Sequence, residues 1–163
     1  MNLKPAIGAA LALILASCAT PALLREADQL TIARQGCFGF CPVYSVQTLT
    51  PSSVRFDGVR HTATLGKVER IVPRAALERL RRDLEFYRPA TDSSFACEQS
   101  VSDQSVYTIR WSRAGTRNIT LSFDSGCATV DGRRLKALLE AVPSRLGLAD
   151  DARQVSRPGV SRG

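Results

Sequence analysis

Cysteine is the residue type with the most chemical options in this 163-residue chain, and there are five of them. Four cysteines could hold zinc, but Cys97 and Cys127 stand alone, without the close pairing typical of structural zinc sites. A redox dithiol usually has two residues between its cysteines, near a strand-to-helix turn. Three residues separate Cys37 from Cys41, and an extended segment follows. The pattern therefore favours two structural disulfides and no metal site, with a redox protein that uses Cys37 and Cys41 as an alternative.

The four cysteines after Cys18 allow three pairings. We favour Cys97 with Cys127, because the segments between them are typical of a hairpin whose two ends lie close together. Cys37 then pairs with Cys41 across a tight loop, and the crossed pairings remain open. Such bonds persist in an oxidising compartment such as the periplasm. The fifth cysteine, Cys18, needs a separate explanation, because an odd cysteine is unusual in a secreted chain.

The only histidine, His61, is the one candidate for a general base, and Asp57 or Asp103 would have to orient it. A single histidine in a predicted loop is more often an ordinary surface residue. The sequence has no serine elbow, zinc-binding helix motif or phosphate-cradling glycine loop. We therefore expect a protein that is not an enzyme and has no cofactor. An envelope enzyme with His61 as its general base is the alternative.

The first residues have the layout of a secretory signal peptide. Lys4 supplies a positive charge, an apolar run extends from Ala6 to Leu15, and the small residues Ala16 and Ser17 follow. The run is too short for a transmembrane helix, which needs about 20 apolar residues. This segment is therefore expected to direct export and not to span the membrane permanently.

The end of the apolar run resembles the lipobox of bacterial lipoproteins: Leu15, Ala16, Ser17 and Cys18. The resemblance implies that residues 1–17 are removed and that the thiol of Cys18 carries diacylglycerol. More than one acyl chain is enough for stable anchoring without a transmembrane helix. Ala19, where an aspartate would retain the protein, implies onward transport to the outer membrane, facing the periplasm. A conventional signal peptide cut near Ala16 or Ala19 is the alternative.

The formal net charge of the whole chain is +7. Cleavage before Cys18 removes only one charged residue, Lys4, so the mature chain stays basic. Such a surface favours anionic neighbours such as lipid head groups or an anionic envelope polymer. Nucleic acid is not expected as a partner, because the export signal directs the domain to a compartment with little of it. The oligomeric state is left open.

Alternation of apolar and polar residues predicts several strands. The first begins around Leu30 and Ile32 and ends at Gly36, and the second covers residues 43–50. A third starts at Val54 and closes at the turn pair Asp57 and Gly58, and residues 60–65 add a further extended piece. The clearest signal is a hairpin, turning near Gly115, whose strands carry matching apolar rows: Tyr107, Ile109, Trp111, Ile119, Leu121 and Phe123.

Two helices are predicted from residues that recur at helical spacing. The first starts at Pro73, ends before Pro89 and has an apolar stripe: Leu77, Leu80, Leu84 and Tyr87. Its other face is expected to be solvated and to hold ion pairs four residues apart: Arg74 with Glu78, Glu78 with Arg82, and Arg81 with Glu85. The second is capped by Asp131 and ends or kinks at Pro143.

These elements predict an α+β fold, in which two helices pack on an antiparallel sheet braced by disulfides. The expected order is strands, helix, hairpin, helix. Residues 29–148 form a single domain, residues 18–28 tether it to the lipid, and residues 149–163 form a disordered tail without an apolar period.

The stretch from Gly36 to Tyr44 resembles the signature of an uncharacterised bacterial envelope family, a domain of unknown function with the pattern Gly-Cys-x-Gly-x-Cys-Pro-x-Tyr. The resemblance covers roughly residues 29–146 and extends to later features: Gly58, Cys97, Asp103, Gly126 and Cys127. No role is carried onto Asp103, which follows Cys97 at a greater distance than in the family pattern. The resemblance implies a fold and no established activity.

The cysteine loop is the candidate contact with a partner, through Phe38, Gly39 and Phe40. The two phenylalanines would anchor a partner if they point outward and belong to the core if they are buried. From the sequence we therefore expect a membrane-anchored periplasmic lipoprotein whose domain binds or scaffolds an envelope protein or polymer.

Overall fold

The computed structural model describes residues 28–155 and contains one seven-stranded sheet in the order β4-β3-β2-β1-β6-β7-β5. The strands are β1 (Gln29–Arg34), β2 (Val43–Thr50), β3 (Ser53–Arg60), β4 (Gly66–Ile71), β5 (Ser93–Ser94), β6 (Val106–Ser112) and β7 (Ile119–Asp124). The helices are α1 (Arg74–Glu85), α2 (Val130–Glu140), α3 (Val142–Arg145) and α4 (Ala149–Ala152). Only β5 pairs in parallel, with β7. The predicted α+β fold with a largely antiparallel sheet is confirmed.

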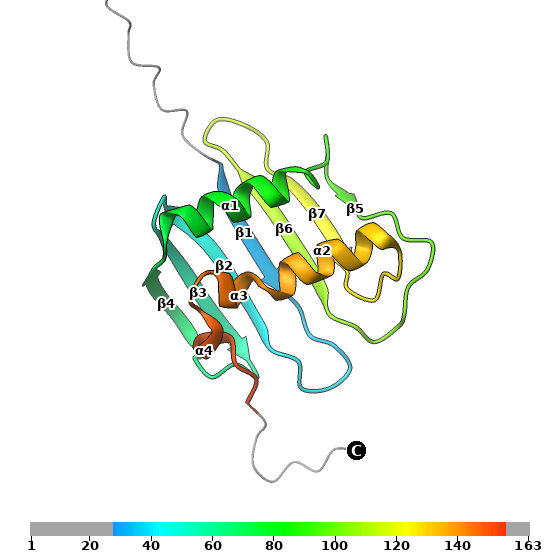
Figure 1. Ribbon diagram of the computed structural model, residues 1–163, viewed down its shortest axis with the longest axis horizontal. Coiled ribbons are helices and arrows are strands. Elements are labelled where there is room, and N and C mark those ends of the chain that lie inside the picture. Colours follow the sequence, from blue (N-terminus) through cyan, green and yellow to red (C-terminus); the bar gives the residue numbers. More distant parts are fainter. Residues whose placement is uncertain (1–27, 156–163) are drawn as a thin grey trace, which may run out of the picture.

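The helices all lie on the same face of the sheet (Figure 1). Strand residues on that face are buried, as in the row of Ile32, Val46 and Phe56 across three neighbouring strands. Helix α1 contributes an apolar stripe of Leu77, Leu80 and Leu84 to the same buried core. On each strand, the residues that alternate with the buried ones face the other side of the sheet. They are mostly polar, because that face of an antiparallel sheet remains in contact with water.

The prediction of an extended segment at residues 60–65 is wrong. Strand β3 continues to Arg60, residues 61–65 form a loop, and the additional edge strand β4 begins at Gly66. Only Val68 of β4 is even partly buried, so the strand has no alternating pattern to detect. Gly58 is needed where this loop folds back, because a Cβ there would lie 1.9 Å from the carbonyl oxygen of Thr64.

The helix ends differ in detail from the prediction. Helix α1 begins directly after Pro73. The cap of α2 is Thr129 and not Asp131, because the hydroxyl of Thr129 accepts a hydrogen bond from the backbone N–H of Gly132 at 3.1 Å. Helix α2 ends before Pro143, which lies in the first turn of the short α3. The predicted order also lacked β4, β5, α3 and α4.

The start of the predicted disordered tail is ordered, which corrects the prediction for residues 149–155. Helix α4 places Asp151 in a buried position, where it accepts hydrogen bonds from Arg70 at 2.8 and 3.0 Å. The hydroxyl of Thr64 donates to the same carboxylate at 2.7 Å. Polar contacts hold this segment, so it lacks the apolar period on which the prediction relied.

Substituting Asp151→Asn should lower the free energy of unfolding at pH 7 by about 1 kcal/mol, since the partner Arg70 is half exposed. The hydrogen bonds from Arg70 lower the pKa of Asp151 below its usual value. A carboxyl group whose pKa is lower in the folded state than in the unfolded state stabilises the fold at any pH above its unfolded-state pKa, which is about 3.9 for aspartate. That contribution to stability is lost as the pH falls through the pKa of the folded state. Urea unfolding should therefore show a gap in stability between wild type and variant at pH 7 that narrows as the pH falls below the unfolded-state pKa. A gap that persists unchanged in acid would contradict this ion pair.

Candidate functional site

The cysteine loop, residues 35–42, joins β1 to β2 at the lower end of the sheet in Figure 1. Cys37 and Cys41 form a disulfide with their Cα atoms 5.6 Å apart. Cys97 and Cys127 form the second, with Cα atoms 5.8 Å apart. The pairing favoured from the sequence is confirmed, and the crossed pairings are not found. The loop leads into a strand, so neither cysteine lies at a helix N-terminus, where a thiolate would be stabilised.

Phe38 and Phe40 have different environments within the cysteine loop. The Phe38 side chain is 87% exposed. Gly39 between them has a φ of 127°, a conformation that residues with a Cβ resist. Phe40 is partly buried and meets the ring of His61 edge-on, with the ring centroids 5.2 Å apart. Of the three predicted contact residues, Phe38 is therefore the one that presents a large apolar side chain to solvent.

Two neighbouring loops support the cysteine loop. The backbone N–H of Phe38 donates a hydrogen bond to the carbonyl of Asp103 at 3.3 Å, and the loop between β3 and β4 supplies His61. His61 and Asp103 are the non-glycine residues with positive φ in the described part of the chain, at 59° and 67°. Backbone of this kind persists only where surrounding contacts hold it. The tip that carries Phe38 is thus fixed by a disulfide and by contacts from both neighbouring loops.

The structure does not assemble the alternative site around His61. Asp57 lies within β3, paired with Ser45 and Lys67 of the adjacent strands. In residues 28–155, neither Asp57 nor Asp103 has a hydrogen bond or ion pair with the His61 side chain, whose ring instead contacts Phe40. The same range contains no group of three or more side chains suited to hold a metal ion.

The predicted lipidation site, Cys18, lies outside the described residues, as do the signal peptide and most of the tether. Asp28, the last residue of that predicted tether, belongs to the folded domain because it forms ion pairs with Arg88 and with Arg113, the latter at 2.6 Å. No helix between Asp28 and Val155 has the length and hydropathy that crossing a membrane requires.

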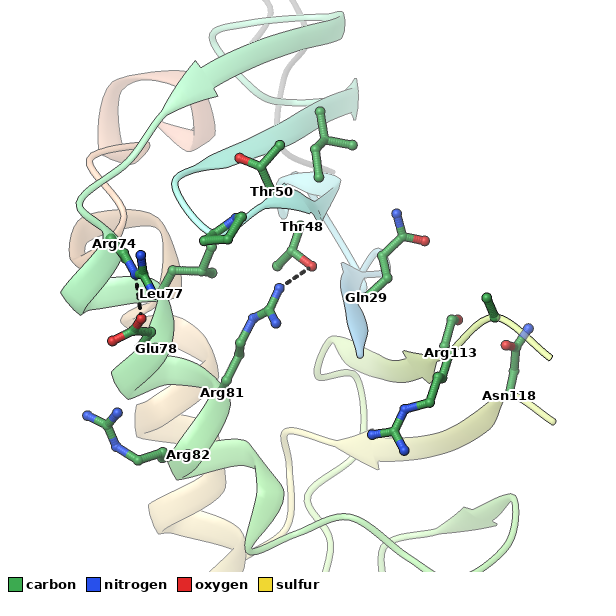
Figure 2. A pocket seen from close by; sticks show the side chains of 14 residues that line it. Gln29, Thr48, Thr50, Arg74, Leu77, Glu78, Arg81, Arg82, Arg113 and Asn118 are labelled. Atoms are coloured by element: carbon green, nitrogen blue, oxygen red, sulfur yellow. Dashed lines mark hydrogen bonds and ion pairs between the residues drawn. The ribbon is translucent and has the colours of Figure 1, made fainter. Parts of the chain in front are cut away.

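Sequence reasoning missed a second feature, a groove at the opposite end of the sheet beside α1 (Figure 2). Arg81 was expected on the solvated face of its helix, paired with Glu85. It instead turns inward and donates a hydrogen bond to the hydroxyl of Thr48 at 3.1 Å. Spacing could have indicated this, because Arg81 lies four residues after Leu77 and three before Leu84, on the apolar stripe. The predicted pair of Arg74 with Glu78 is present at 2.7 Å.

Comparison with known proteins gives a family but no activity. No curated protein sequence matches this chain. A family model described as a domain of unknown function, DUF6438, matches residues 28–144. That range covers every element from β1 to α2 and both disulfides. Because the match includes most of the chain, this protein belongs to the DUF6438 family.

Proposed function

We propose that this chain is a lipid-anchored protein of the bacterial cell envelope that binds an envelope protein through Phe38, without catalysing a reaction. The carrying observation is that Phe38 is 87% exposed on a tip held by a disulfide. An exposed phenylalanine forgoes roughly 1.5–3 kcal/mol of burial, which a partner can recover on binding. Aromatic side chains are frequent anchors of protein interfaces, and a loop held in one conformation loses little entropy when it binds.

A protein surface suits this tip better than an anionic polymer does. Phe38 is apolar, and other exposed apolar side chains are Val59 near the end of β3, Leu65 in the loop from β3 to β4 and Val101 in the segment before β6. These segments lie at the same end of the sheet as the cysteine loop (Figure 1). An apolar group gains most from a partner that offers an apolar pocket. We therefore assign the tip to a protein partner and not to a charged polymer.

The anchoring half of the proposal rests on Cys18 and the residues before it. Mass spectrometry of the protein extracted from envelopes should find a mature N-terminus at Cys18 with diacylglycerol on its sulfur. Cys18→Ser should block this processing and leave the uncut precursor. An unmodified thiol at Cys18, or a mature chain that starts at another residue, would refute the anchor but not the binding tip.

A photo-crosslinking side chain placed at position 38 in living cells should give a discrete adduct with one envelope protein. The matched control is position 86, because Phe86 is also a phenylalanine and is 82% exposed. Phe38→Ser should lose the partner while leaving the midpoint of urea unfolding unchanged, since its side chain adds little to the core. Phe86→Ser should keep the partner. Equal adducts at both positions, or none at 38, would refute the binding tip.

A further inference from the structure

The groove beside α1 lies at the end of the sheet away from the cysteine loop, where β1 begins and the turn from β6 to β7 lies. Its volume is about 910 Å³. A smaller hollow of about 280 Å³ adjoins it and shares three lining residues, Arg81, Arg82 and Arg113. Figure 2 shows Arg81 reaching from α1 across the middle of the groove toward Thr48.

Arg81 is held in place by a single polar contact and is only partly open to solvent. Its Nε atom is buried and has no hydrogen-bond partner in the described structure. Burial lowers the pKa of its guanidinium, against the opposing influence of Asp28 and Glu78. A partly desolvated guanidinium without a carboxylate partner costs free energy, which an anion in the groove would offset.

The carboxylates that line the two hollows are already used by other arginines. Glu78 pairs with Arg74 at 2.7 Å, and Glu85 pairs with Arg88 at 3.4 Å. Asp28 pairs with both Arg88 and Arg113. Within residues 28–155, this leaves Arg81 without an ion-pair partner.

Arg82, the residue after Arg81, also lacks an ion-pair partner in residues 28–155. It is exposed, lines both hollows and forms no ion pair with any described residue. Two adjacent arginines of one helix therefore border the groove without a direct ion pair to any described carboxylate.

We propose that this groove is a binding site for a phosphate group, with Arg81 as its central contact and Arg82 at its rim. Arginine presents a planar fork of N–H donors that matches phosphate oxygens. Neutral donors also line the groove, namely the amides of Gln29 and Asn118 and the hydroxyl of Ser112. Such donors beside an arginine suit a phosphate group, which has more acceptor oxygens than the two of a carboxylate.

The phosphate could be free or part of an anionic lipid headgroup, and the two sources share the same recognition chemistry. The site does not depend on Phe38 or on lipid at Cys18, because every residue in it lies within α1, the sheet and their turns. Its test is accordingly independent of both halves of the proposed function.

Trp111 provides the readout, because it is the only tryptophan and lines the smaller hollow. The full chain, purified in non-ionic detergent as cells produce it, is titrated separately with inorganic phosphate, dihexanoyl phosphatidylglycerol and succinate, at constant ionic strength. Phosphate or the lipid should change the fluorescence saturably. Binding of both indicates that the phosphate group suffices, and binding of the lipid alone identifies a headgroup. No saturable response to either, or succinate binding as tightly, overturns the proposal.

Arg81→Gln should weaken binding at least tenfold, and Arg81→Lys should weaken it less because the charge remains without the fork. The matched control is Arg79→Gln, which removes the same charge from an exposed position of α1 outside both hollows and should change affinity less than twofold. Equal weakening by Arg81→Gln and Arg79→Gln would indicate unspecific attraction and overturn the site. If Arg81→Gln lowers the melting temperature, exposed Arg82 replaces it, and Arg82→Gln should weaken binding at least threefold.

Discussion

Replacing both Cys97 and Cys127 by serine should lower the free energy of unfolding by about 3–4 kcal/mol. The bond closes a loop with a sequence separation of 30 residues, so breaking it restores much conformational entropy to the unfolded chain. The loop contains the whole β6–β7 hairpin. The cysteines also bring the irregular segment before β6 against the turn that leads into α2, where Ser100 bridges to Cys127. Urea unfolding without reductant measures the difference.

The matched control for this substitution is the pair Cys37→Ser and Cys41→Ser. Its loop has a sequence separation of only 4, so the same model gives a loss of about 2 kcal/mol. The disulfide that closes the longer loop should therefore contribute more to the free energy of unfolding. The disulfide between Cys37 and Cys41 should mainly fix the position of Phe38. Equal losses for the two double variants, or no loss for Cys97 and Cys127, would show that loop entropy does not govern the stabilisation.

The sequence predicted the elements that bury a face. Tyr107, Ile109 and Trp111 alternate because one side of β6 packs against the helices, and each is at most 3% exposed. Leu77, Leu80 and Leu84 recur at helical spacing for the same reason. A periodic signal exists wherever one face of an element is buried and the other is solvated. The two longer helices, α1 and α2, were therefore predictable without knowledge of their partners.

Elements held by polar contacts or by pairing alone could not be predicted in this way. Strand β4 pairs along its whole length with residues 53–58 of β3 but leaves nearly all of its side chains exposed. Strand β5 has only two residues, and its backbone pairing to β7 leaves no pattern in the sequence. Helix α4 depends on Asp151 contacting Arg70, which is distant along the chain. Such contacts are visible only once the fold brings the two segments together.

Within the candidate site, too, only the features that follow from periodic patterns were predictable. The favoured cysteine pairing followed from a hairpin that sequence reasoning had already identified. The outward direction of Phe38 and the inward direction of Phe40 were left open, because that loop has no periodicity to assign its sides. Arg81 was placed on the wrong face, because pairing by charge was given more weight than its position beside Leu77 and Leu84. Position on a helix stripe was the better guide here.

Phe123→Ala should lower the free energy of unfolding by about 3–5 kcal/mol, since the substitution leaves a large cavity in the core. The Phe123 side chain is fully buried on β7. Phe95 packs edge-on against it at 5.3 Å between centroids, and Tyr87 lies beyond Phe95 at 6.4 Å. These three rings connect the end of α1 to β7. The middle ring, Phe95, lies in the segment that the disulfide of Cys97 also holds in place. Urea unfolding of the variant measures the loss.

Phe86→Ala is the matched control for this core substitution, because Phe86 is exposed and should cost less than about 0.5 kcal/mol. Phe123→Leu should cost less than alanine does, since leucine fills part of the cavity. The aromatic packing and the disulfide act on the same segment, so their effects should not simply add. Once Cys97 and Cys127 are serines, the Phe95 segment is free to move, and Phe123→Ala should then cost less than in wild type. Full additivity in this double-mutant cycle would mean that the disulfide does not help to hold Phe95 against Phe123.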